Sequence, residues 1–222
     1  MPEELAKIGR RELLVVAHCS LLLAALGARP AKAQPARAKK LLVVGDSLSA
    51  EYGLQRGSGW VALLAARIGR DKLPWDVVNA SISGDTTSGG RSRLAPLLAQ
   101  HKPALVVIEL GGNDALRGLP LAMTQANLTE MARAAKAAGA KPVIVGMAVP
   151  PNYGKKYGDD FFALFAQVAK AEGAALVPFL LHGVADIPDA ETMFQPDRIH
   201  PKAEAHPRML DNVWPVLKPL LR

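Results

Sequence analysis

The chain has 222 residues, of which 50% are hydrophobic, with 27 basic and 20 acidic side chains and a formal charge of +7. This length accommodates one α/β domain with a sizeable core and is marginal for two domains. The basic residues are scattered and do not alternate with aromatic residues, so the composition predicts no nucleic-acid partner.

The first 33 residues have the order of a secretory signal peptide. An apolar run over 13–26 follows several basic side chains and precedes the small-x-small sequence Ala31-Lys-Ala33. We predict cleavage after Ala33, a linker over 34–40, and a periplasmic or secreted mature protein without stable membrane insertion. The run is shorter than the ~20 residues that a membrane span needs. An uncleaved membrane anchor is the alternative.

Cys19 is the single cysteine, and it lies in the segment that we expect to be removed. The mature chain would then contain no disulfide framework, no cysteine nucleophile and no thiolate metal site.

Short apolar runs alternate with amphipathic segments along the rest of the chain. The predicted strands lie at 41–44, 77–78, 105–110 and 143–145, and a fifth lies within 175–181. The predicted helices lie at 60–68, 88–100, 124–138, 160–172 and 203–217. This alternation is typical of βαβ units around a parallel sheet, so we predict one doubly wound α/β domain over 41–222.

Polar and glycine-rich sequences follow the first three predicted strands. They are Gly45-Asp-Ser-Leu-Ser49, Asn79-Ala-Ser-Ile-Ser-Gly-Asp85 and Gly111-Gly-Asn-Asp114. Ligands bind just outside the carboxyl ends of the strands in open parallel sheets, which is where Ser47 and Asn113 are expected. Taken alone, Ser47 is more simply interpreted as a helix N-cap.

Asp197 precedes His200 by three residues, near the predicted last helix. In a helical turn, this spacing lets the carboxylate accept the Nδ1–H of the imidazole and leaves Nε2 free as a base. Ser47, Asp197, His200 and Asn113 together supply a nucleophile, an orienting group, a base and an amide donor. These are the parts that an acyl-transfer hydrolase requires.

These sequence blocks resemble those of the SGNH (GDSL) hydrolase superfamily, in particular the bacterial periplasmic acyl-CoA thioesterase, lysophospholipase and arylesterase group. The resemblance extends from Leu41 to about Pro219. It implies a flavodoxin-like three-layer α/β/α fold with a five-stranded parallel sheet. It also implies hydrolysis of acyl esters and thioesters without a cofactor or metal, by a protein that we expect to be a monomer.

The resemblance assigns roles to individual residues. Ser47 matches the nucleophile, and Asp197 and His200 match the other two members of the triad. The N–H groups of Ser47 and Gly84 and the side-chain amide of Asn113 match the oxyanion hole.

Two positions depart from the family pattern. Glu51 stands where a glycine is common, which predicts a negative charge near the mouth of the cleft. Ala148 stands where an arginine is often found, so both departures bear on substrate preference. The candidates for the acyl-binding wall flank the motif loops: Leu48, Tyr52, Leu116, Leu119, Val149, Pro150 and Tyr153. These side chains would alternatively only pack the loops.

Three other functions fit the sequence less well. Gly57-Ser-Gly-Trp-Val-Ala62 fits a dinucleotide fingerprint as a bare pattern, but it lies well beyond the first strand, and the second strand does not end in an acidic residue. A carbohydrate-ester deacetylase of the same fold and a flavodoxin-like binding protein are the remaining alternatives. The binding protein would leave the Asp197–His200 pair unexplained.

Overall fold

The computed structural model describes residues 38–222, so the predicted signal peptide and most of the predicted linker lie outside the described residues. In the described part, five parallel strands form one sheet with the order β2-β1-β3-β4-β5. The strands are β1 Lys39–Gly45, β2 Trp75–Asn79, β3 Leu105–Glu109, β4 Lys141–Val145 and β5 Ala175–Val177. Lys39 and Lys40 already pair with β2, so the strand begins inside the predicted linker.

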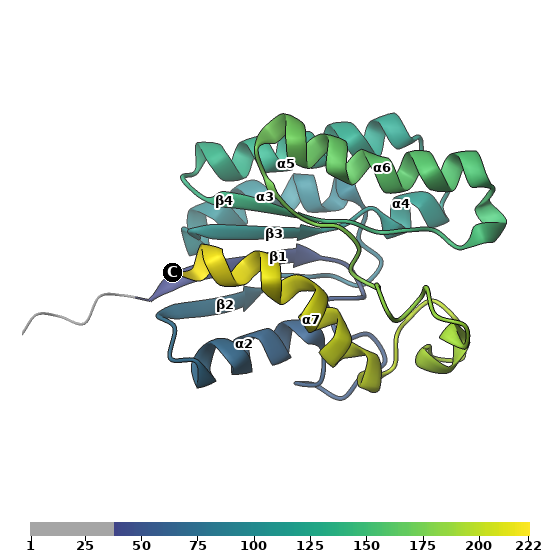
Figure 1. Cartoon of the computed structure of the whole chain (residues 1–222). Coiled ribbons are helices and arrows are strands. Elements are labelled where there is room, and N and C mark those ends of the chain that lie inside the picture. The colour runs from purple at the N-terminus through teal and green to yellow at the C-terminus, as the bar shows by residue number, and fades with distance from the viewer. Residues whose placement is uncertain (1–37) are drawn as a thin grey trace, which may run out of the picture. The chain divides into compact units, whose positions relative to one another are not determined.

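Helices cover both faces of this sheet (Figure 1). Helices α2 (Trp60–Arg70) and α7 (His206–Leu217) pack against each other on one face. Helices α3 (Thr87–His101), α5 (Leu121–Ala137) and α6 (Lys155–Glu172) lie side by side on the other face. The predicted three-layer α/β/α fold is therefore confirmed. No helix within residues 38–222 is both long and apolar enough to cross a membrane.

Strand β1 lies between β2 and β3, and its sequence from Leu41 to Val44 is continuously apolar. Its side chains alternate between the two faces of the sheet, and both faces are covered by helices. Leu41 and Val43 pack with Trp60 in the core cluster on the α2 and α7 side, whereas Leu42 and Val44 pack in the opposite cluster. These four side chains are fully buried. The strand therefore holds its carboxyl end, where Ser47 follows, in a fixed position.

Helix α6 begins at Lys155, five residues before the start that the sequence predicted at residue 160. Its first turn carries the ion pairs Lys155–Asp159 and Lys156–Asp160, each 2.6 Å long and exposed to solvent. Pairs at this spacing support a helix without contributing apolar residues, so the hydrophobic pattern did not reveal this turn.

The fifth strand was predicted within 175–181 and occupies only the first three residues of that segment, because the chain leaves the sheet after Val177. Proline follows at position 178, and proline has no N–H to donate to a neighbouring strand. The short helix α4 (Gly112–Leu116) was not predicted either, because five residues are too few to show a hydrophobic period.

Candidate active site

The turn that carries Ser47, residues 46–50, follows directly where β1 ends at Gly45, and we call it the serine turn. The N–H groups of Ser49 and Ala50 both donate to the carbonyl of Asp46, at 3.2 and 2.9 Å. The N–H of Leu48 donates to Asp46 Oδ1 at 3.0 Å. Ser47 is thereby held at the outside of a tight turn. The N-cap interpretation of Ser47 is wrong, because the next helix, α2, begins only at Trp60 and has Gly59 as its N-cap.

Ser47, His200 and Asp197 form one continuous hydrogen-bonded chain. Ser47 Oγ lies 2.8 Å from His200 Nε2, and His200 Nδ1 lies 2.7 Å from Asp197 Oδ2. The other carboxylate oxygen, Asp197 Oδ1, accepts the backbone N–H groups of Ile199 and His200 at 2.9 and 3.0 Å. The structure thus brings together the three residues that the sequence proposed as a triad.

Asp197 is suited to remain charged. Partial burial raises the pKa of Asp197, but the N–H groups of His200 and Ile199 and the imidazole together outweigh burial and lower it to about 2. The carboxylate is then ionised at neutral pH, and its Oδ2 accepts the Nδ1–H of the imidazole. This tautomer leaves Nε2 with a lone pair directed at Ser47 Oγ.

The loop that carries His200 is fixed by contacts with the serine turn. The ring of Tyr52 lies with its centroid 4.3 Å from that of His200. Gln195 Nε2 donates to the carbonyls of Tyr52 and Pro201 at 3.0 and 3.2 Å. The Gln195 N–H also donates to the His200 carbonyl at 2.8 Å. These bonds join two segments that are far apart in the sequence and so set the Ser47–His200 distance.

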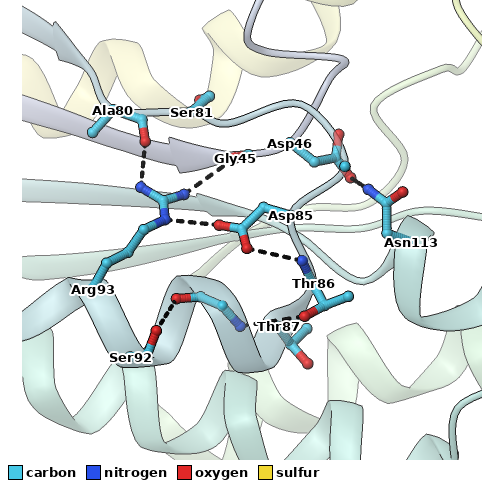
Figure 2. A network of polar contacts seen from close by, with 12 residues as sticks. Gly45, Asp46, Ala80, Ser81, Asp85, Thr86, Thr87, Ser92, Arg93 and Asn113 are labelled. Atoms are coloured by element: carbon cyan, nitrogen blue, oxygen red, sulfur yellow. Dashed lines mark hydrogen bonds and ion pairs between the residues drawn. The ribbon is translucent and has the colours of Figure 1, made fainter.

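The proposed oxyanion donors surround the serine turn. Within residues 38–222, neither the N–H of Ser47 nor that of Gly84 donates to a protein acceptor, so both stay available to a ligand. Gly84 adopts φ +79°, a conformation that glycine accepts without steric cost. Asn113 Nδ2 donates one hydrogen to Asp46 Oδ2 at 3.1 Å, which leaves the second amide hydrogen free (Figure 2).

Two buried carboxyl groups support the serine turn from beneath. Burial raises the pKa of Asp46, which is 2% exposed, to about 6. Burial and the neighbouring charge of Asp46 raise the pKa of Glu109 well above its ordinary value. Glu109 Oε2 accepts Ser49 Oγ at 2.5 Å and the Asp46 N–H at 3.3 Å. Sequence reasoning missed Glu109, and the only signal was a lone acidic residue at the end of an apolar strand.

Glu51, which was expected to place a negative charge near the cleft mouth, is bound by the loop that leads into α2. Its carboxylate turns back and accepts the N–H groups of Gly57 and Gly59 at 2.8 to 3.1 Å. Glu51 has φ +61°, a conformation that favours glycine. Glu51, which departs from the family pattern, therefore helps to hold the loop that leads into α2.

The residues expected to form the acyl wall fall into different environments. Leu48 packs against the core on the α2 and α7 side, and Val149 packs against the opposite core cluster. Leu116 and Pro150 are exposed and Leu119 is half-buried. Tyr153 packs near Tyr157, with 6.3 Å between the ring centroids. Leu48 and Val149 thus contribute to packing, whereas Tyr52 contacts the triad directly.

A cavity of about 530 Å³ lies beside the serine turn on the β2 side of the sheet. It is lined by Ala50, Glu51, Leu54, Arg56, Val61 and Ser81, among others. The size is in the range of small-molecule sites. The described residues 38–222 contain no group of three or more side chains suited to hold a metal ion.

An open parallel α/β sheet with a Ser–His–Asp chain at its carboxyl edge is typical of serine hydrolases. Residues 43–208 match the profile of the GDSL-like lipase/acylhydrolase family. The match covers most of the chain, which therefore belongs to this family.

Individual relatives support the same assignment. The chain is 53% identical to esterase TesA of Pseudomonas aeruginosa over 91% of this chain and 99% of the relative. It is 41% identical to thioesterase 1/protease 1/lysophospholipase L1 of Escherichia coli K12, over 84% of this chain and 86% of the relative. The crystal structure of a protein named TesA superposes with a TM-score of 0.79 at 54% identity, covering 82% of this chain and 99% of that one.

Proposed function

We propose that this enzyme, a serine ester hydrolase, cleaves acyl esters and thioesters through an acyl-enzyme formed on Ser47. The observation that carries the proposal is the 2.8 Å contact between Ser47 Oγ and His200 Nε2, with Asp197 on the far side of the imidazole. All three side chains come from one chain, so the site needs no second copy.

In the proposed mechanism, His200 Nε2 takes the proton of Ser47 Oγ as the oxygen attacks the acyl carbonyl. Asp197 stabilises the imidazolium that forms. The negative oxygen of the tetrahedral state accepts the N–H groups of Ser47 and Gly84 and the free amide hydrogen of Asn113. His200 then gives its proton to the leaving alcohol or thiol. Water, activated by the same imidazole, releases the acid and restores Ser47.

Apolar side chains around the site favour a substrate with an acyl chain over a carbohydrate ester. The exposed large hydrophobic residues in the described part of the chain are Tyr52, Ile82, Leu116, Phe162 and Ile199. Tyr52, Ile82 and Ile199 lie in the loops that carry the site, and Leu116 ends the short helix α4, which carries Asn113. The names of the relatives, esterase and thioesterase/lysophospholipase, agree with an acyl substrate.

The N-terminal sequence supports export of the enzyme. We propose that residues 1–33 are a signal peptide that is removed, which leaves a periplasmic or secreted protein beginning at Gln34. Mass spectrometry of the exported protein should find this N-terminus. An exported protein that still carries residues 1–33 would favour the membrane anchor instead.

A partitioning experiment tests the acyl-enzyme directly. Two substrates share one acyl group, for example p-nitrophenyl butyrate and a butyryl thioester, and are hydrolysed in the presence of hydroxylamine. If both form the same butyryl-Ser47 intermediate, the ratio of hydroxamate to free acid is the same for the two leaving groups. A ratio that depends on the leaving group would contradict a common intermediate.

A further inference from the structure

Arg93 of α3 lies at the centre of a polar network with Gly45, Ala80 and Asp85 (Figure 2). Its side chain is 19% exposed. Arg93 Nε donates to Asp85 Oδ2 at 2.7 Å, and Nη2 donates to the carbonyl of Gly45 at 3.3 Å. Nη1 donates to the carbonyl of Ala80. One guanidinium thus joins the end of β1, the segment after β2 and the loop that carries Gly84.

Asp85 connects this network to the oxyanion donor. It follows Gly84 directly, and its side chain is 11% exposed. Asp85 Oδ1 accepts the N–H of Thr86 at 3.0 Å, and the N–H of Asp85 donates to the carbonyl of Ile82 at 3.1 Å. Gly89 makes room for this carboxylate, because a Cβ at that position would lie 1.8 Å from Asp85 Oδ1. The backbone on the carboxyl side of Gly84 is therefore fixed through a side chain.

Gly84 cannot fix its own orientation. It has no side chain, it adopts φ +79°, and its N–H has no protein acceptor within residues 38–222. A glycine populates many backbone conformations when its neighbours do not restrain it. The direction of the Gly84 N–H must then be set by the residues around it. The Asp85–Arg93 pair is one such contact, and it is largely buried. Arg117 adds a bond to the Gly84 carbonyl at 2.8 Å, but from the exposed side.

We propose that Arg93 is a positioning residue for the oxyanion hole, acting through Asp85 on the Gly84 N–H and through the Gly45 carbonyl on the serine turn. This inference rests on the proposed function, because it presumes that Gly84 binds the oxyanion. Arg93 does not touch the substrate. The planar guanidinium offers donors in several fixed directions at once, which a lysine ammonium on a flexible stem does not reproduce.

The test compares Arg93→Met and Arg93→Lys with a matched control on the same helix. Arg91 pairs with Glu130 at 3.0 Å on the exposed side of α3, so Arg91→Met removes an ion pair without touching the site. Removing an oxyanion donor outright costs ~10²–10³ in turnover. A misdirected donor should cost less, so we expect kcat of Arg93→Met to fall ~10–100-fold with KM nearly unchanged. Arg91→Met should keep the wild-type kcat.

Arg93→Lys retains a positive charge near Asp85 and keeps the proposal testable if Arg93→Met does not fold. We expect its kcat to lie between those of the wild type and Arg93→Met. Asp85→Asn should also lower kcat, and the double variant Asp85→Asn/Arg93→Lys should be no slower than the slower single variant, because both changes break one contact. Labelling of Ser47 by a phosphonate ester should slow in parallel with kcat.

The outcomes separate this inference from the proposed function. If kcat per folded molecule stays within about twofold of the wild type in Arg93→Lys and Asp85→Asn, Arg93 is only a structural residue and the inference is wrong. A rise in KM at constant kcat would also overturn it. The partitioning experiment on the wild type decides the acyl-enzyme independently of either variant.

Discussion

Asp46 offers a test in which stability and function change in opposite directions. Its carboxylate is buried, yet it accepts the Leu48 N–H and the Asn113 amide, and it directs Asn113 toward the site. Burial raises its pKa from the ordinary 3.8 to about 6. Each pKa unit corresponds to about 1.4 kcal/mol. Ionised Asp46 therefore costs the folded state about 3 kcal/mol relative to the unfolded chain.

The sign of the pH dependence follows from the direction of this pKa change. A raised pKa means that the folded state binds the proton more tightly, so the cost is absent below pH 3.8 and complete above about pH 6. The cost is about 1 kcal/mol at pH 4.5 and about 3 kcal/mol at pH 7.5 by linkage. Asp46→Asn carries no such charge. The free energy of unfolding of Asp46→Asn, relative to that of the wild type, should therefore increase by about 2 kcal/mol from pH 4.5 to pH 7.5.

Denaturant unfolding of the wild type and Asp46→Asn at a series of pH values measures this difference. Asp76→Asn in the exposed part of β2 is the control and should follow the wild-type curve. Turnover of Asp46→Asn should fall, by up to ~10², because Leu48 and Asn113 donate to different oxygens of Asp46, and the NH2 group of asparagine would face one of these donors. If the free energies of unfolding of the wild type and Asp46→Asn changed in parallel from pH 4.5 to 7.5, the assignment of a raised pKa to Asp46 would be refuted.

Substitutions at three further positions test other contacts around the site. Asn113→Ala should lower kcat by ~10²–10³ with little change in KM in steady-state assays, whereas a change confined to KM would argue against an oxyanion donor. Asp197→Asn should lower turnover by up to ~10⁴ in single-turnover measurements, because the imidazole loses its orienting carboxylate. A wild-type rate would remove Asp197 from the triad. Glu51→Ala should lower the free energy of unfolding by about 1–2 kcal/mol as the Gly57 and Gly59 N–H groups lose their acceptor. Glu51→Gly should cost about 1 kcal/mol less, because glycine relieves the positive φ, and the reverse order would contradict this account.

The sequence was sufficient to predict the sheet and the order of the motif loops, because each depends on local patterns. Strand β1 is buried on both faces and therefore reads as a continuous apolar run. Asp197 and His200 are three residues apart, so their contact follows from one turn of the chain. Ser47 could be placed at the strand end for the same reason, and the parallel topology then brings it to His200.

The supporting contacts could not be predicted, because they depend on segments that meet only in the folded chain. Arg93 bonds to carbonyls at residues 45 and 80, and no sequence spacing indicates those partners. Glu109 is remote in sequence from Ser49, and its significance appears only once β1 and β3 are paired. The partners of Glu51 could not be predicted either, because Gly57 and Gly59 belong to a loop without a regular pattern.

The central claim is that Ser47 carries the acyl group during turnover. Mass spectrometry of the enzyme after reaction with a phosphonate ester, followed by peptide mapping, tests it most directly. The wild type and the control Ser58→Ala, which removes another half-buried serine, should each gain one adduct, located on Ser47, and lose esterase activity in proportion to labelling. Ser47→Ala should fold, gain no adduct and have no more than a trace of activity. Substantial hydrolysis by Ser47→Ala, or an adduct on another residue that accounts for the loss of activity, would contradict the account.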